Sequence, residues 1–328
     1  MISMNAAVVG AAGGPPEITT VTLDEPRSDE VLVKLVASGL RHTDMAFRDR
    51  VVTPSAFGHE GSGIVEEVGS AVHGFSAGDK VVLAQGHEER GDSLGQSTFG
   101  GYVLALERNL VKVADDTPLE LLEILGPLGG GIQAGAGAVL NSLGVEAGAS
   151  IVIFGAGGAG LGALLAAVIA GATTIIVSDT HESRLELARS LGATDTILAS
   201  DPDGPAKMID LTHGGADFSV ETSGNMGAAR TSVDILNSTG TAAMVGIGRP
   251  GAMVAFDHAL LRSGRRVIGV TEEDTVPQEF IPAMIELHRQ GRFAFDAFVR
   301  RYPFTDIQKA VDDSESGVTV KGVLVYDR

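Results

Sequence analysis

Apolar residues near the start of the chain come in short runs that are separated by glycines. Apolar or β-branched runs lie at residues 31–36, 58–69 and 78–83, and each of the last two begins with a glycine turn. Runs of this kind are typical of β-strands, and closely spaced glycines suit a strongly bent sheet. Residues 1–130 are therefore predicted to form a barrel-like β domain.

The middle of the chain alternates runs of strand length with longer helical patterns. Strands are expected at residues 151–154, 175–178, 218–221, 241–246 and 266–270, and helices at 161–170, 184–191 and 227–236. This alternation predicts an α/β fold with a doubly wound parallel sheet over residues 131–292. Ser183 is the expected N-cap of the second helix, and Gly192 is expected to end it.

The last part of the chain mixes both kinds of element. Helices are expected near residues 277–290 and at 307–314, and a strand at 318–326. We expect residues 293–328 to rejoin the first domain, so that one domain is split in sequence around the other.

Composition narrows the class of protein. The chain has 328 residues, a formal net charge of −18 and no cysteine. The acidic balance argues against nucleic acid as a partner, and the lack of cysteine excludes disulfides and thiolate zinc sites. Residues 151–178 are uncharged and long enough to span a bilayer, but their glycines and threonines favour a buried strand–helix–strand unit. The start of the chain lacks a signal-peptide pattern, so we expect a cytoplasmic protein with no membrane partner.

A glycine motif carries the strongest chemical signal. Gly155, Gly157, Gly158 and Gly160 lie in the sequence GAGGAG, which follows a predicted strand and opens a predicted helix. Such glycines allow a tight turn, close approach of a pyrophosphate and close helix packing, and the helix N-terminus faces the phosphates. Asp179 ends the next strand, where a carboxylate binds the ribose hydroxyls and repels a 2′-phosphate. The predicted cofactor is NAD(H).

With these motifs the chain resembles the medium-chain dehydrogenase/reductase superfamily, in its zinc-type alcohol dehydrogenase branch and most of all its aryl- or benzyl-alcohol dehydrogenases. The motifs are GHEGSGIVEEVG (58–69), GQSTFGGYVLALERNLVKV (95–113), GGGIQAGAGAVLN (129–141) and RQGRFAFDAFVRRYPFTDI (289–307). The resemblance implies a GroES-like β-barrel catalytic domain (1–130 and 293–328) and an NAD-binding Rossmann domain (131–292). It also implies a homodimer through the Rossmann domain, for which we take residues 292–299 as the candidate edge strand.

The family's zinc ligands are altered in this sequence. The family motif Cys-His-Thr-Asp reads Arg-His-Thr-Asp here, so Arg41 stands at the first ligand position, and the second cysteine corresponds to Gly130. His59 is retained beside Glu60. Only residues 84–94 stand where the cysteine-rich structural-zinc lobe would lie, so that lobe is expected to be lost. One imidazole and one carboxylate fall short of three protein ligands, and the charge of Arg41 opposes a cation. We expect no zinc.

Other positions follow from the resemblance. Those expected to contact the cofactor are His42 and Lys321 at the pyrophosphate, Arg184 at the adenosine ribose, Thr222, Ser223 and Asn225 at the adenosine, and Val245 and Gly269 near the nicotinamide. The catalytic candidates are Arg41, which could stabilise developing negative charge, and Thr43, His59 or Glu60, any of which could donate a proton. The competing interpretation pairs Arg41 with Glu60 as a structural plug and leaves His59 as a relic of the fold.

Three functions remain open on the sequence. A site without the metal's Lewis acid suits a substrate that is already activated, so the first is zinc-independent, NAD(H)-linked reduction of an activated C=C, C=N or carbonyl group in a small molecule. The second is aryl-type alcohol dehydrogenase chemistry, which interconverts alcohol and aldehyde. The third is a non-catalytic NAD(H)-binding protein, which the retained Thr43 and the intact glycine motif disfavour.

Overall fold

A computed structural model describes residues 1–11, 13–41, 44, 55, 56, 58–84, 97–270 and 275–327. The chain divides into two compact units. The first contains Met1–Gly130, Pro277–Ala283 and Val299–Arg328, and the second contains Gly131–Val276 and Met284–Phe298. The division falls inside helix α9 (Pro277–Arg289).

The first unit is built around strand β3 (Glu30–Gly39), which lies inside a seven-stranded sheet. The sheet order is β15-β16-β3-β5-β6-β8, and β7 also pairs with β3. The other strands are β15 (Val299–Pro303), β16 (Lys321–Val325), β5 (Glu60–Val68), β6 (Lys80–Leu83), β7 (Tyr102–Leu106) and β8 (Leu110–Lys112). The register between β3 and β5 shifts twice, and bulges of this kind bend a sheet toward a barrel. Gly63 pairs with Leu35 of β3 between these two shifts, and an added Cβ there would clash with the carbonyl oxygen of Lys34.

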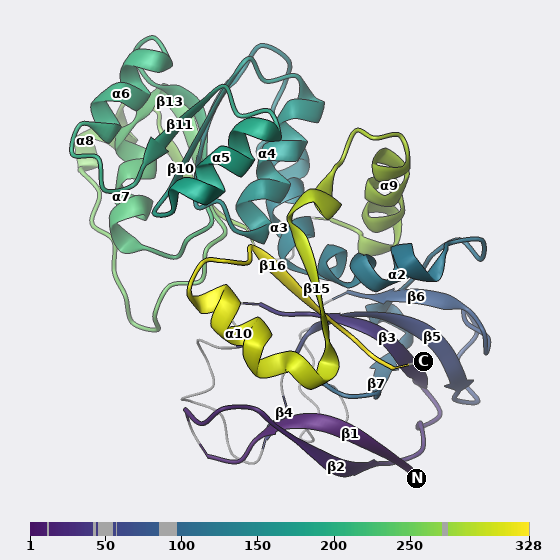
Figure 1. Cartoon of the computed structure of the whole chain (residues 1–328). Coiled ribbons are helices and arrows are strands. Elements are labelled where there is room, and N and C mark those ends of the chain that lie inside the picture. The colour runs from purple at the N-terminus through teal and green to yellow at the C-terminus, as the bar shows by residue number, and fades with distance from the viewer. Residues whose placement is uncertain are drawn as a thin grey trace. The chain divides into compact units, whose positions relative to one another are not determined.

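Further elements complete this unit. Strands β2 (Glu17–Leu23), β1 (Ile2–Val9) and β4 (Ser55–Ala56) form a separate three-stranded sheet, and helices α2 (Leu119–Leu125) and α10 (Ile307–Glu315) add to the strands (Figure 1). The unit is thus not purely β. Its last strand, β16, pairs with β3 and β15, both of which belong to the same unit.

The second unit is a six-stranded parallel sheet in the order β11-β10-β9-β12-β13-β14. Its strands are β9 (Ser150–Phe154), β10 (Thr174–Asp179), β11 (Asp195–Leu198), β12 (Ala216–Glu221), β13 (Leu236–Met244) and β14 (Arg266–Gly269). The helices are α3 (Gly131–Gly137), α4 (Gly158–Ala170), α5 (Glu182–Ser190), α6 (Gly204–Leu211), α7 (Met226–Asp234) and α8 (His258–Arg262). The strand order reverses between β9 and β12, and ligands of such sheets bind at the carboxyl ends next to this reversal.

Glycines let helices α3 and α4 approach backbone to backbone. A Cβ on Gly135 would clash with the carbonyl oxygen of Ala159, and one on Gly162 would stand 2.5 Å from the carbonyl oxygen of Ile132. Most residues of helix α4 are buried, and a buried helix carries no charged residues because an unpaired charge is costly away from water. Residues 151–178 therefore form the predicted strand–helix–strand unit, and in the described part of the chain no helix is long and apolar enough to cross a membrane.

Three local predictions are wrong. Helix α5 begins at Glu182 with His181 as its N-cap rather than Ser183, because the Asp179 carboxylate accepts the His181 N–H and sets the turn. Residues 292–299 form no edge strand of the parallel sheet. Phe295–Phe298 is a 3-10 helix whose aromatic side chains are buried, and Val299 begins β15 of the other unit. The edges of the parallel sheet are β14 and β11. The second unit accordingly keeps residues up to Phe298, beyond the predicted return at residue 293.

Candidate functional site

The glycine motif forms the turn between β9 and α4. Gly155 has a φ of +97°, a conformation that side chains disfavour, and a Cβ on Gly160 would clash with the carbonyl oxygen of Gly155. Around Gly157 an added Cβ would meet no described atom within 4 Å. Gly158 is the first residue of α4. The turn thus packs tightly beneath Gly160 and leaves open space at Gly157, at the N-terminus of a thirteen-residue helix, which fits a diphosphate.

Asp179 lies at the end of β10 and braces this turn. Its Oδ2 accepts a hydrogen bond from the Ala156 N–H at 2.7 Å, and its Oδ1 accepts one from the His181 N–H at 2.9 Å. The His181 ring Nδ1 also lies 3.3 Å from Oδ1. A carboxylate oxygen has two acceptor positions, so Oδ2 keeps capacity for a ribose hydroxyl. Arg184 Nη1 stands 3.9 Å from Asp179 Oδ2, and Arg184 Nε is buried without a hydrogen-bond partner among the described residues. These residues fit the adenosine end of a dinucleotide.

The other cofactor candidates of this unit gather at the carboxyl ends of neighbouring strands. The Thr222 hydroxyl follows β12 and donates to the carbonyl oxygen of Phe154 at 2.8 Å, which ties it to the glycine turn. Asn225 caps helix α7 by accepting from two backbone N–H groups. Val245 directly follows β13, and Gly269 is the last residue of β14.

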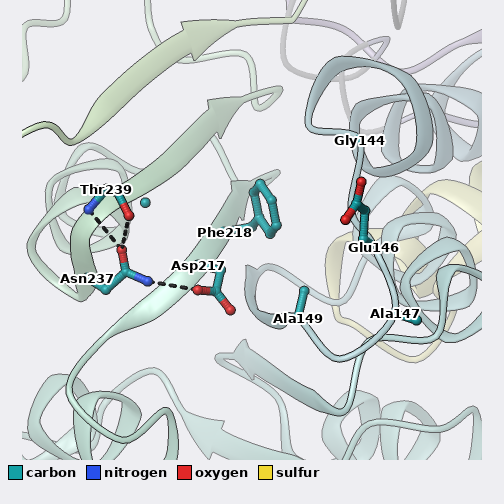
Figure 2. Close-up of a pocket in the computed structure, with 9 residues that line it drawn as sticks. Gly144, Glu146, Ala147, Ala149, Asp217, Phe218, Asn237 and Thr239 are labelled. Carbon is teal, nitrogen blue, oxygen red and sulfur yellow. Dashed lines mark hydrogen bonds between the residues drawn. The ribbon is translucent and has the colours of Figure 1, made fainter.

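A pocket lies at the amino ends of the strands, opposite the glycine turn (Figure 2). Glu146, Asp217 and Asn237 are among the residues that line it. Asp217 accepts hydrogen bonds from the Ser150 N–H and hydroxyl and from the Asn237 side chain, so it holds the starts of neighbouring strands together. Of the predicted site residues that the structure describes, none lines this pocket.

In the first unit, Glu60 is fully buried between two cations. Lys321 Nζ stands 2.5 Å from its Oε2, and Arg41 Nε stands 3.5 Å from its Oε1. Lys321 Nζ also donates to the carbonyl oxygen of Leu40 at 3.0 Å, and its side chain is only 5% exposed. The Lys321 ammonium is thus engaged by Glu60, and its expected contact with the pyrophosphate stays a prediction.

Glycines on both sides make room for this carboxylate. A Cβ on Gly130, the position of the family's second cysteine, would clash with Glu60 Oε1, and one on Gly39 would clash with Oε2. Glu60 thus fills the volume that a cysteine side chain at residue 130 would need. Among the described residues no group of three His, Cys, Asp or Glu could hold a metal, and Arg41 places a guanidinium at the first ligand position. The residues do not fit the family's zinc.

His59 is held by a residue that the sequence predictions did not single out. Its Nδ1 donates to Asp44 Oδ1 at 2.8 Å, and the Asp44 side chain is fully buried while that of His59 is 54% exposed. The Arg41 N–H donates to the other Asp44 oxygen at 2.9 Å. The hydrogen bond to Asp44 raises the pKa of His59 above its usual value, against a smaller opposing effect of burial. The sequence offered a signal for this role of Asp44, because Asp44 is the last residue of the four-residue motif that begins with Arg41. His42 and Thr43 lie outside the described residues.

Comparison with known proteins bears on this pair of units. Residues 27–115 match the alcohol dehydrogenase GroES-like domain family, and residues 158–289 match the zinc-binding dehydrogenase family. Geraniol dehydrogenase of Castellaniella defragrans is 38% identical, over 99% of this chain and 98% of its own length. The chain belongs to the zinc-type alcohol dehydrogenase family. Members are oxidoreductases of the medium-chain dehydrogenase/reductase superfamily and depend on a nicotinamide cofactor.

Solved structures of family members agree over the whole chain. Benzyl alcohol dehydrogenase of Acinetobacter calcoaceticus is 39% identical with a TM-score of 0.94, and an alcohol dehydrogenase zinc-binding domain protein of Burkholderia ambifaria is 41% identical with a TM-score of 0.95. Both comparisons cover 100% of each chain. The predicted family and fold class are confirmed. The alignment with geraniol dehydrogenase runs over 372 positions although this chain has 328 residues, so the relative has segments that this chain lacks. Of the three functions left open, these relatives favour alcohol–aldehyde interconversion.

Proposed function

We propose that this protein interconverts an allylic or benzylic primary alcohol and its aldehyde with NAD(H), without zinc in the family's position. The substrate class is supported by the names of two relatives, geraniol dehydrogenase and benzyl alcohol dehydrogenase. The observation that carries the metal-free part is the arrangement around Glu60, where Arg41 and Lys321 supply cations and Gly130 supplies no ligand.

The positive charges take over part of the work of a Lewis acid. Arg41 and Lys321 place two cations against the Glu60 carboxylate at the position where the family binds its metal, while the second buried carboxylate, Asp44, is hydrogen-bonded to His59. A guanidinium is always protonated, and fixed cations and donors stabilise the negative charge that develops on a substrate oxygen. Arg41 is the more accessible of the two, since its side chain is 16% exposed against 5% for Lys321. Arg41 is the group that we assign to the substrate oxygen.

His59 is the proposed proton donor and acceptor. A buried carboxylate that holds one ring nitrogen fixes the tautomer and favours the imidazolium, which leaves the other nitrogen for the substrate. NADH, when bound, supplies the hydride that adds to the aldehyde carbon. The His59 imidazolium gives its Nε2 proton to the oxygen, which forms the alcohol. In the reverse direction neutral His59 takes the hydroxyl proton. Glu60 is ill suited to this role because each of its oxygens faces a cation.

Conjugation suits such a site. Loss of a hydride and the hydroxyl proton from an allylic or benzylic alcohol gives a conjugated aldehyde, so the substrate itself lowers the demand for polarisation of its oxygen. The preference for NAD(H) rests on Asp179, whose carboxylate would repel a 2′-phosphate.

The experiment is an NADH-oxidation assay with cinnamaldehyde, followed by product analysis. The proposal predicts cinnamyl alcohol. A second candidate, reduction of the activated C=C bond, is favoured by the loss of the family's metal ligands and predicts the saturated aldehyde instead. Binding of NADH without turnover of any aldehyde or enone would support the non-catalytic interpretation and contradict both.

A further inference from the structure

We propose that Glu221 is a positioning residue of the cofactor site, which holds the adenosine-binding turn and the end of β13 in one arrangement. This inference rests on the proposed binding of NAD(H). In the sequence Glu221 is only the last residue of a predicted strand. The residue is 2% exposed and lies at the carboxyl end of β12, beside the point where the strand order reverses.

The Glu221 carboxylate organises the turn at residues 222–225. Its Oε1 accepts hydrogen bonds from the Ser223 N–H at 2.8 Å and from the Ser223 hydroxyl, and both of its oxygens lie 3.1 Å from the Gly224 N–H. The Ser223 oxygen in turn accepts from the Asn225 N–H at 3.2 Å. The adenosine candidates Ser223 and Asn225 are thus both tied, directly or through one hydroxyl, to this carboxylate.

The same residue joins the turn to the neighbouring strand. The Glu221 carbonyl oxygen accepts from the N–H groups of Val245 and Gly246 at 2.9 and 2.8 Å. A Cβ on Gly246 would stand 2.5 Å from Glu221 Oε2 and would clash with the backbone nitrogen of Gly224. The carboxylate is therefore wedged between the ends of β12 and β13, where Val245 is expected near the nicotinamide.

Burial disfavours the charged form of the Glu221 carboxyl group. Burial therefore raises the pKa of Glu221 above the usual value, although the hydrogen bonds from Ser223 and Gly224 oppose the shift. Strand packing alone would be served equally well by an apolar residue, since a buried charge stabilises a fold only when it is fully hydrogen-bonded. An acceptor for converging N–H groups, by contrast, is what the turn requires. A glutamine could offer only one oxygen, and its amide N–H groups would face the N–H of Gly224.

The test is the dissociation constant of NADH for Glu221→Gln, measured by fluorescence on the full chain together with the melting temperature. We expect NADH binding to weaken by about tenfold or more, as the loss of charge-assisted hydrogen bonds predicts, with a similar loss for ADP-ribose because the adenosine turn is affected. KM for the aldehyde at saturating NADH should stay unchanged. The exposed Glu286→Gln on α9 is the matched control and should bind NADH like the wild type.

The outcomes separate this inference from the proposed function. If Glu221→Gln lowers the melting temperature but binds NADH as tightly as the wild type at temperatures where both are folded, Glu221 is merely structural and the inference is wrong. If the variant fails to fold, Glu221→Asp, which keeps the charge but withdraws the carboxylate from the Ser223 and Gly224 N–H groups, must still weaken NADH binding. Unchanged binding in that variant would overturn the inference. Wild-type protein that binds no NADH would instead overturn the proposed function.

Discussion

His59 and Asp44 are joined by a 2.8 Å hydrogen bond from the exposed imidazole to a fully buried carboxylate. In a zinc enzyme of this family the corresponding histidine binds the metal. Here the buried partner remains while the neighbouring ligand positions hold Arg41 and Gly130. We propose that this hydrogen bond orients the imidazole for proton transfer, with one ring nitrogen held by Asp44 and the other directed to the substrate.

The pH dependence of aldehyde reduction should follow His59. Its pKa is raised above 6.5, chiefly by the hydrogen bond to Asp44, so the imidazolium that donates the proton persists to higher pH than usual. The rate of reduction should fall as pH rises through this pKa, and alcohol oxidation should rise over the same range. Asp44→Asn removes the negative partner and should move both limbs to lower pH. A pH profile that does not move in Asp44→Asn would contradict the assignment. For His59→Asn we expect the rate to fall by about 10²–10⁴-fold, and an unchanged rate would contradict the assignment as well.

Arg41 is expected to matter for turnover more than for cofactor binding. Arg41→Ala should lower kcat by about two to three orders of magnitude, as loss of an oxyanion-stabilising donor does, with the Kd for NADH nearly unchanged. Arg41→Lys keeps the charge and should retain more of the activity. If Arg41→Ala lowers the melting temperature and leaves kcat intact, Arg41 is only the partner of Glu60.

Glu60 should matter for stability. It is fully buried between Arg41 and Lys321, so Glu60→Gln leaves a buried ammonium without its counter-charge. Breaking such a pair costs about 3–5 kcal/mol of unfolding free energy, which urea unfolding would detect. Glu66→Gln on the exposed face of β5 is the control and should change little. Equal stability of the two variants would mean that Lys321 finds another partner.

Asp179 should set the choice of cofactor. Asp179→Ser removes the charge that repels a 2′-phosphate, and Arg184 lies close enough to attract one. The ratio of kcat/KM for NADH to that for NADPH should fall by about tenfold or more. Binding of NADH should weaken too, because Asp179 also braces the glycine turn through Ala156. A wild type that already prefers NADPH would refute the assignment.

Five of the six strands of the parallel sheet were predictable because strand and helix patterns are local, and the glycine motif is local as well. The short strand β11 and the helices α3, α6 and α8 were not predicted. The contacts of the candidate site in the first unit were less predictable from the sequence. Lys321 and Glu60 are far apart in sequence, and only the pairing of β16 with β3 and of β3 with β5 brings them together. The hydrogen bond from the Ala156 N–H to Asp179 also joins residues that are distant in sequence, and the pairing of β9 with β10 brings them together. The aromatic residues at 293–298 misled the strand prediction, since their spacing serves burial in a 3-10 helix.

The proposed homodimer now has a different candidate edge. Strand β14 ends the parallel sheet and presents unpaired backbone groups, which pairing across a two-fold axis would satisfy. Light scattering at micromolar concentration should give the mass of a dimer. Ile268→Lys on β14 should shift it toward a monomer, whereas Leu198→Lys on the opposite edge strand should not. A monomeric wild type would contradict the proposal.

The central claim is alcohol–aldehyde interconversion without zinc in the family's position. The most direct measurement combines elemental analysis for zinc with the rate of cinnamaldehyde reduction by NADH, before and after treatment with EDTA. We expect substoichiometric zinc, cinnamyl alcohol as the product, and the same rate after EDTA. Activity that EDTA abolishes and added zinc restores would contradict it.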